Sequence, residues 1–349
     1  MTPAASTVLV FLDPAFPDGR VADATRPQLM VTDLGATRGD GVFETMLAVD
    51  GAVRKMQAHL DRLATSAEAL DLVIPDQDAW RSAIATALAE HRSQRPAAPL
   101  ADAVGAGTTD ENRAVAQAGA AGETGPAAQA GAAGETGPAA DADETVVKLV
   151  VTRGVEGASA PTCWVQASPA GEAGRRQRET GIDVILLDRG YDSDAAERAP
   201  WLLLGAKTLS YAVNMAALRH AHKQGADDVI FLSSDGRVLE GPTSTVLMAY
   251  VEKSDDGAPV KRLITPQLDS GILPGTSQGA LFAAAKAAGW ELGYGPLEPQ
   301  DLLDADAVWL ISSVRLLAPV NRIDGKEIGT PSLQKELTAE LSRLFAGIG

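Results

Sequence analysis

The sequence is poor in the residues that several kinds of site require. Of its 349 residues only Cys163 is a cysteine, so an internal disulfide and a zinc site built on cysteines are both excluded. Of the four histidines, His220 and His222 are two positions apart and would diverge on a helix. We therefore expect no metal site.

Basic residues and long apolar runs are also scarce. Lysine and arginine number 30 against 46 acidic residues, a formal net charge of −16. Nucleic acids and anionic membranes are bound through basic surfaces, so we expect neither as a partner. No apolar run approaches the ~18 residues that cross a bilayer. The opening "MTPAASTVLVFLDPAF" lacks the basic region of a signal peptide. We expect a cytoplasmic protein.

Residues 93–143 differ in composition from the rest of the chain. They consist mostly of small and polar residues, and "AQAGAAGETGPA" occurs identically at 116–127 and 128–139. Such a segment cannot bury enough apolar surface to offset its ordering entropy. We predict a disordered surface insert, which costs little because closure entropy grows only logarithmically with loop length.

The remaining residues alternate between strand and helix patterns. The first part predicts strands over 27–33, 41–54, 145–154 and 162–169, with a turn at Asp50-Gly51 within 41–54 and helices over 56–72 and 76–92. The second part predicts strands over 181–188, 228–236, 244–252 and 307–313, and a terminal helix over 331–347. We expect an α/β (α+β) protein of two domains, 1–168 and 179–349, joined by a linker at 169–178. The cleft between two such domains is a usual place for a ligand.

Lys207 lies in an unusually apolar segment, "WLLLGAKTLSYAVNMAAL". Desolvation would lower the pKa of its ammonium and allow it to form a Schiff base and move protons. If a helix has begun by Lys207, Tyr211 and Asn214 lie on the same face. The alternative is a lysine at the end of a strand that extends its ammonium to water, with Tyr211 packed in the core.

Two other segments offer groups suited to a phosphate or a ring nitrogen. "RVLEGPTST" places Glu240 before a loop containing Thr243 and Ser244, and "LPGTSQGALF" places Thr276 and Ser277 at the start of a helix. Helix N-termini bind phosphate through free amides, although a hydroxyl there is often only a cap.

Arginine and small residues occur together in two further segments. "HLDRLATSAEAL" places Arg62 on a helix from which it could bind a phosphate. "GATRGDGVFET" predicts a tight turn before the strand that carries Glu44. It is not a P-loop, because no Gly-Lys-Ser/Thr follows.

Together and in this order, these segments resemble one family. The series "TRGDGVFET", "HLDRL", "VVTRG", "KTLSYAVNMAAL", "DVIFLSSDGRVLEGPTST" and "TPQLDSGILPGTSQ" is similar to the class IV, fold-type-IV pyridoxal-phosphate enzymes. These include branched-chain aminotransferases, D-amino-acid aminotransferases and 4-amino-4-deoxychorismate lyases. The resemblance runs from about Pro27 to Gly325 and is interrupted only by the insert.

The resemblance implies a role for each residue that matches a family motif. Lys207 matches the Schiff-base lysine, Glu240 the acid that bonds the pyridine nitrogen, and Arg62 the phosphate-binding arginine. Tyr211 lies where members place a residue near the cofactor ring. The residues implied at the phosphate are Thr243, Ser244, Thr276 and Ser277. The family is commonly homodimeric, so a homodimer is expected.

Two positions depart from the family pattern. Its frequent asparagine after the "EG" loop is Thr245 here, and its "G-I-T-R" turn reads Gly275-Thr276-Ser277-Gln278, without the arginine. Both positions lie near the phosphate, so the resemblance implies that phosphate binding is rearranged there.

The segment after "TRG" favours a lyase acting on a small amino substrate. D-amino-acid aminotransferases typically carry Arg-x-His a few residues later, and "TRGVEGASAPTCW" has neither residue after Arg153. Branched-chain enzymes usually differ at "GDGVFET". Glu44 keeps transamination open, and Arg153 and Arg315 are candidate carboxylate anchors. The alternatives are a D-amino-acid or branched-chain aminotransferase and a non-catalytic binding protein with the same fold.

Overall fold

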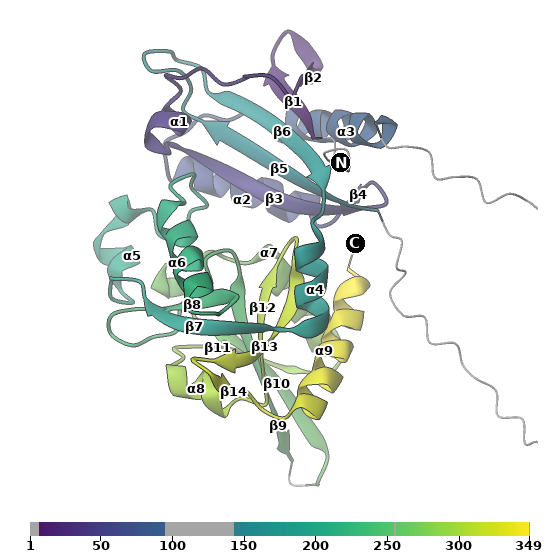
Figure 1. Ribbon diagram of the computed structural model, residues 1–349, viewed down its shortest axis with the longest axis vertical. Coiled ribbons are helices and arrows are strands. Elements are labelled where there is room, and N and C mark those ends of the chain that lie inside the picture. Colours follow the sequence, from purple (N-terminus) through teal and green to yellow (C-terminus); the bar gives the residue numbers. More distant parts are fainter. Residues whose placement is uncertain (1–6, 95–142, 255, 349) are drawn as a thin grey trace, which may run out of the picture. The chain divides into compact units, whose positions relative to one another are not determined.

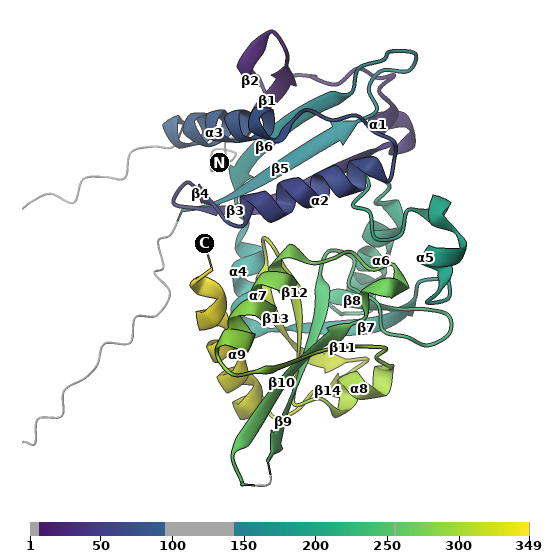
Figure 2. The same ribbon diagram turned by 180° about the vertical axis from the view of Figure 1, so that it is seen from behind.

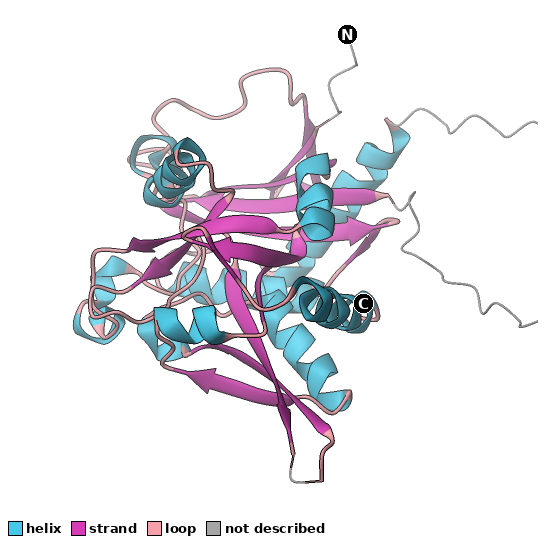
Figure 3. Ribbon diagram, turned by 60° about the horizontal axis from the view of Figure 1, so that its bottom comes forward, coloured by secondary structure: helices cyan, strands magenta, loops and turns pink. Residues whose placement is uncertain are grey.

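The computed structural model describes residues 7–94, 143–254 and 256–348. The described residues form one compact unit built around two β-sheets, which can be followed in Figures 1 and 3. The repeat-containing insert lies outside the described residues, apart from its first and last positions.

The first sheet is six-stranded, antiparallel throughout, and ordered β2-β1-β6-β5-β3-β4. Its strands are β1 (Val8–Asp13), β2 (Phe16–Ala22), β3 (Gly41–Val49), β4 (Ala52–Val53), β5 (Glu144–Thr152) and β6 (Thr162–Pro169). Helices α2 (Met56–Glu68) and α3 (Gln77–Ser93) cover one face (Figure 2).

The core of this half lies between the sheet and the two helices. In α2, Leu60, Leu63 and Ala67 recur at helical spacing and are buried. In α3 the buried residues include Trp80 and Ile84, and the side chain of its N-cap residue Asp76 accepts from the backbone N–H of Ala79. The other face of the sheet, which carries Phe43 and Thr45, is left for the pocket described below.

The second sheet is eight-stranded and mixed, in the order β11-β10-β9-β12-β13-β7-β8, with β14 paired to β13. Its strands are β7 (Ile182–Asp188), β8 (Asp228–Leu232), β9 (Thr245–Lys253), β10 (Pro259–Pro266), β11 (Glu291–Gly295), β12 (Ala307–Ser312), β13 (Leu316–Ile323) and β14 (Lys326–Glu327). The strands β13, β7 and β8 run parallel, so crossover segments connect them.

Helices and short turns surround this second sheet. They are α4 (Glu172–Thr180), α5 (Ala195–Arg198), η1 (Pro200–Leu202), α6 (Ala212–Lys223), η2 (Leu268–Ser270), α7 (Thr276–Ala287), α8 (Pro299–Asp304) and α9 (Pro331–Ala346). A short helix of the first half, α1 (Leu34–Arg38), completes the set of described helices. Helices α7 and α9 pack against an apolar cluster that includes Trp309, Leu281 and Leu337.

The secondary structure agrees with most of the expected pattern. The predicted turn at Asp50-Gly51 joins β3 to β4, and the helices at 56–72 and 76–92 appear as α2 and α3. The strand expected at 27–33 was wrong. There the chain forms turns, with only an isolated bridge from Asp33 to Val155, and the Asp33 side chain accepts from the Gly35 backbone N–H to cap α1. The hairpin β1–β2 was not anticipated.

The segment 169–178, expected as a linker, contains most of α4, which packs against β13. The division into domains 1–168 and 179–349 stays a prediction. Among the described residues, no helix is long and apolar enough to cross a membrane.

The described residues that flank the insert meet at one turn. The backbone N–H of Asp50 donates to the carbonyl of Asp143 at 2.9 Å, and that of Asp143 donates to the Asp50 carboxylate at 3.1 Å. Gly51, at φ 82°, lies so close to the Arg92 guanidinium that a side chain there would collide with it. Both flanks therefore reach the Asp50-Gly51 turn.

Candidate active site

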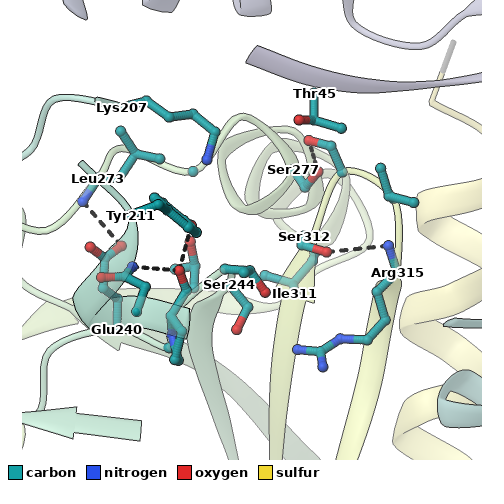
Figure 4. Close-up of a pocket in the computed structure, with 18 of the residues that line it drawn as sticks. Thr45, Lys207, Tyr211, Glu240, Ser244, Leu273, Ser277, Ile311, Ser312 and Arg315 are labelled. Carbon is teal, nitrogen blue, oxygen red and sulfur yellow. Dashed lines mark hydrogen bonds between the residues drawn. The ribbon is translucent and has the colours of Figure 1, made fainter. Parts of the chain in front are cut away.

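A cavity of about 660 Å³ is lined by residues of both sheets and of the loops between them (Figure 4). Most of the residues singled out from the sequence line it. These are Arg62, Lys207, Tyr211, Glu240, Thr243, Ser244, Thr276, Ser277 and Arg315. The structure thus brings together groups from segments far apart in the sequence.

Lys207 is held at the cavity by its backbone. Its N–H donates to Ser66 Oγ at 3.1 Å, and its carbonyl accepts from the N–H of Phe43 at 3.0 Å. Lys207 precedes α6, which begins at Ala212, so no helix has begun by Lys207 and the condition for a helical face shared with Tyr211 and Asn214 is not met. The loop is instead fixed by pairing with β3, because Thr208 forms a bridge to Val42.

The Lys207 side chain reaches the cavity among aromatic rings. Its Nζ lies 4.5 Å from the centroid of the Phe43 ring and 5.7 Å from that of Tyr211. Burial lowers the pKa of Lys207 to about 8, although the carboxylate of Glu44 acts in the opposite direction. About a tenth of the amine is therefore unprotonated at pH 7, far more than for an ordinary lysine, and this is the form that a nucleophile requires.

Glu240 occupies the floor of the cavity. Burial raises its pKa to about 7, and the N–H of Leu273, which donates to Oε2 at 3.2 Å, partly opposes this. A carboxyl group near its titration point can share a proton with a ring nitrogen placed against it.

Tyr211 and Asn214 converge on one backbone carbonyl. The Tyr211 hydroxyl and the Asn214 amide, at 2.7 Å for the latter, both donate to the carbonyl of Pro242. These bonds fix the loop that follows Glu240. The Tyr211 ring packs edge-on against Phe43, with centroids 5.3 Å apart.

The loop after Glu240 and the start of α7 form a cradle of small residues. A Cβ at Gly275 would lie 2.5 Å from Thr245 Oγ1, and one at Gly241 would lie 2.4 Å from Ser244 Oγ, so only glycine fits at either position. Ser244 Oγ is buried and has no hydrogen-bond partner within the described chain. The first backbone bond of α7 runs from Gly279 to Gly275, which leaves the amides before it available.

Glu44, His59 and Arg62 form a buried cluster beside this cradle. Arg62 bonds Glu44 through Nε and Nη2 at 2.7 and 2.9 Å, and Glu44 Oε2 lies 2.7 Å from His59 Nδ1. Burial opposes ionisation of Glu44, but His59 and Arg62 together outweigh it and lower the pKa to about 2. Desolvation lowers the pKa of His59, which is therefore neutral. Glu44 is fully buried and does not line the cavity.

Hydroxyl groups continue this cluster toward α7. His59 Nε2 lies 3.3 Å from Thr276 Oγ1 and 3.2 Å from Ser313 Oγ. Ser277 Oγ lies 3.2 Å from Ser313 Oγ and accepts from Lys55 Nζ at 2.9 Å. Because Nδ1 of the neutral His59 carries the proton shared with Glu44, its Nε2 accepts from one of the hydroxyls.

The two arginines considered as carboxylate anchors lie in different places. Arg153 bonds Asp40 at 2.7 Å and the carbonyls of Leu70 and Asp71, and these contacts hold it away from the cavity. Arg315 lines the cavity. Its Nη1 bonds Asp228 at 2.6 Å, whereas its buried Nε and Nη2 have no partner among the described residues.

Comparison with known proteins identifies the family. The family model of amino-transferase class IV matches residues 41–118 and 132–323. The chain is 40% identical over 324 residues to the bifunctional aminodeoxychorismate lyase / D-amino acid transaminase of Mycobacterium tuberculosis, covering 93% of this chain and 95% of that protein. The chain belongs to the class IV aminotransferase family.

Solved structures of the family agree. A PLP-bound aminotransferase from M. tuberculosis superposes with a TM-score of 0.75 at 38% identity, covering 98% of this chain and 99% of that one. The fold-IV transaminase CpuTA1 from Curtobacterium pusillum gives 0.75 at 39%, covering 97% of each chain. The protein has the fold of the fold-type-IV enzymes and is a pyridoxal-phosphate-dependent enzyme.

The residues at the cavity fit this cofactor. The unpartnered Ser244 hydroxyl, the cradle at Gly241 and Gly275 and the free amides of α7 suit a phosphate, while Glu240 suits a pyridine nitrogen. The individual roles implied for these residues stay predictions. The described residues contain no group of three or more His, Cys, Asp or Glu side chains that could hold a metal ion.

Lys148, on β5, was not among the site residues predicted from the sequence. Its Nζ lies 4.9 Å from the centroid of the Phe43 ring that Lys207 also approaches. Lys148 is paired across the sheet with Thr45, which lines the cavity. Burial lowers its pKa, and it has no hydrogen bond or ion pair within the described chain. No local pattern marks this lysine, because only strand pairing brings it near Lys207.

Proposed function

We propose that this protein is an aminodeoxychorismate lyase, which converts 4-amino-4-deoxychorismate into p-aminobenzoate and pyruvate for folate biosynthesis in the cytoplasm. The observation that carries the proposal is the pair of lysines around Phe43. Lys207 offers a reactive amine, and Lys148 offers an ammonium without a counter-ion. The substrate carries an amine and two carboxylates, so it can engage both lysines. The similarity to a protein named for this activity supports the same conclusion.

Bound pyridoxal phosphate supplies the electron sink that makes the hydrogen on the amine-bearing carbon acidic. Lys207 then takes that proton, which its lowered pKa allows. The bond from the adjacent ring carbon to the enolpyruvyl oxygen breaks, with the electron pair leaving on that oxygen, and the ring becomes aromatic. The expelled enolate takes up a proton and becomes pyruvate. Glu240 would keep the pyridine nitrogen of the bound cofactor protonated, and Lys148, beside the lining residue Thr45, would bind a carboxylate of the substrate.

Transamination of D-amino acids is the second candidate. The relative from M. tuberculosis is named for both activities, and another structure of an aminotransferase from that organism contains α-ketoglutarate. A dicarboxylic 2-oxo acid would also place one carboxylate near Lys148. The two reactions share the proton transfer by Lys207 and differ in the step that follows. The lyase expels the enolpyruvyl group, whereas the transaminase passes the amino group to a 2-oxo acid.

The test is to incubate the purified holoenzyme with aminodeoxychorismate and, separately, with a panel of D- and L-amino acids and 2-oxoglutarate. We expect p-aminobenzoate, detected by its fluorescence, and none from Lys207→Ala. Rapid half-transamination by D-alanine without p-aminobenzoate would reverse the order of the two candidates. Lys286→Met, an exposed change far from the cavity along α7, is the matched control.

We also propose that the protein is a homodimer. Large apolar side chains of β2 and the following loop are exposed: Phe16, Val21, Leu29, Met30 and Val31. A second, smaller cavity of about 270 Å³ adjoins them, lined by Leu29, Phe11 and Trp164 among others. Exposed apolar side chains of this number are typical of an interface. Sedimentation velocity of the wild type and of Met30→Asp tests it, and a monomeric wild type would contradict it.

A further inference from the structure

The phosphate end of the cavity has less positive charge than its arginine suggests. Glu44 is ionised and bonds Arg62 through both carboxylate oxygens, so this pair is neutral as a unit. His59 is neutral as well. Gln278, which stands where the family turn has an arginine, instead donates to the Tyr294 hydroxyl at 3.0 Å. A dianionic phosphate would therefore lack a net counter-charge from these residues.

Lys55 provides the missing charge. It is the N-cap of α2, in a left-handed backbone conformation at φ 54°, which directs it toward α7. Its Nζ donates to Ser277 Oγ at 2.9 Å and lies 4.4 Å from the centroid of the Phe345 ring. No carboxylate bonds it among the described residues. Burial, Arg54 and Arg62 lower its pKa to about 7, so an arriving anion would stabilise its charged form.

The bond from Lys55 also settles the direction of the Ser277 hydroxyl. An ammonium can only donate, so Ser277 Oγ accepts from Lys55 and keeps its own proton for another acceptor. Ser277 is the second residue of α7 and lines the cavity. Its hydroxyl proton can point to Ser313 Oγ, 3.2 Å away, or to an anion bound at the helix N-terminus.

We propose that Lys55 is a positioning residue for the cofactor phosphate, which supplies the net positive charge at this end and orients Ser277 as a donor in place of the absent arginine. The proposal concerns retention of the cofactor. It goes beyond the proposed function and holds for either reaction.

The experiment compares two ligands in the apoprotein. Pyridoxal phosphate and pyridoxal, which lacks the phosphate, are titrated by absorbance into wild type and Lys55→Met. We expect the Kd for pyridoxal phosphate to rise roughly 10- to 100-fold, as for loss of a hydrogen bond to a charged group, and the Kd for pyridoxal to stay unchanged. Lys55→Arg restores most of the affinity. Lys286→Met removes the same charge at the far end of α7 and leaves both constants unchanged.

A second variant tests the orientation of the hydroxyl. Ser277→Ala weakens binding of pyridoxal phosphate in the wild type and adds little in the Lys55→Met background, because both changes remove one bonded unit. An unchanged Kd in Lys55→Met, or an equal loss for pyridoxal, would overturn the proposal. So would full additivity of the two changes. If Lys55→Met does not fold, the two ligands are compared in Ser277→Ala and Lys55→Arg instead. An unchanged Kd for pyridoxal phosphate in Ser277→Ala then contradicts the proposal.

Discussion

Phe43 contacts Lys207 at both ends of the lysine. The backbone N–H of Phe43 donates to the Lys207 carbonyl at 3.0 Å, and the ring of Phe43 lies 4.5 Å from the lysine Nζ. Phe43 thus positions both the backbone of the loop that contains Lys207 and the amine of the Lys207 side chain. Lys207 has no carboxylate at bonding distance among the described residues, so its reactivity depends on this aromatic and desolvated setting.

The first prediction concerns the covalent site. Borohydride reduction of the holoenzyme should fix the cofactor on the peptide that contains Lys207, because this amine lines the cavity and is partly unprotonated. Mass spectrometry of the digested protein locates the label. Lys148→Met serves as the control and should leave the label at Lys207. A label on another lysine in the wild type contradicts the assignment.

The second prediction concerns the free amine of the apoprotein. Only the unprotonated form of an amine acylates, so the reactivity of Lys207 should reach half its maximum near pH 8. An ordinary lysine does so near pH 10.4. Competitive labelling with acetic anhydride between pH 6 and 11, followed peptide by peptide, measures this. A midpoint above pH 10 would show that burial does not activate the lysine.

The third prediction concerns acid stability. The pKa of Glu44 is lowered in the fold to about 2 from its ordinary value of 4.5, so its contribution to stability is complete above about pH 5 and disappears as the pH falls toward 2. That contribution is roughly 3 kcal/mol for such a shift. Glu44→Gln should therefore lower the free energy of unfolding at pH 7 by more than at pH 3.5.

Urea unfolding at both pH values makes this comparison. Glu68→Gln, exposed on α2, the helix that carries His59 and Arg62, is the matched control and should change stability little at either pH. An equal loss at pH 7 and pH 3.5 in Glu44→Gln would mean that the carboxylate charge is not what the cluster depends on.

Local patterns were enough to predict much of the fold. The Asp50-Gly51 turn and the helical spacing of Leu60 and Leu63 depend on neighbours along the chain, and both were found as expected. The error at 27–33 has the same origin. The apolar residues Leu29, Met30 and Val31 are typical of a strand, but in the structure they are exposed. Asp33 is the N-cap of helix α1.

The site was predictable only where a family motif marks it. Lys207, Glu240 and Arg62 lie in segments that resemble the family, and the structure gathers them at one cavity. Lys55 and Lys148 were not picked out by any family motif in the sequence. Each gains its position from a distant segment, Lys55 from Ser277 and Lys148 from its pairing beside β3. Such contacts cannot be seen in a single sequence.

The fourth prediction separates substrates by charge. Lys148→Met should raise the KM for 2-oxoglutarate roughly tenfold or more and leave that for pyruvate nearly unchanged, because only the former has a second carboxylate. Lys148→Arg should retain most of the preference for 2-oxoglutarate over pyruvate. Steady-state kinetics with the two acceptors measures it. An equal rise for both acceptors would show that Lys148 does not distinguish them.

The fifth prediction concerns the insert. Because Arg92 and Asp143 both reach the Asp50-Gly51 turn, replacing residues 95–142 by a short Gly/Ser linker should keep the fold and the affinity for pyridoxal phosphate. Thermal unfolding and the cofactor titration measure the two properties. A variant that folds but no longer retains the cofactor would show that the insert contributes to the site.

Arg54 and Lys55 both touch the last turn of α9. Arg54 donates to the carbonyls of Phe345 and Ile348, the second at 3.0 Å, beside the ring that Lys55 contacts. A cation at the end of a helix also complements its dipole. Any purification tag fused to this helix would lie beside Lys55, which we propose retains the cofactor, so a tag belongs elsewhere in the chain.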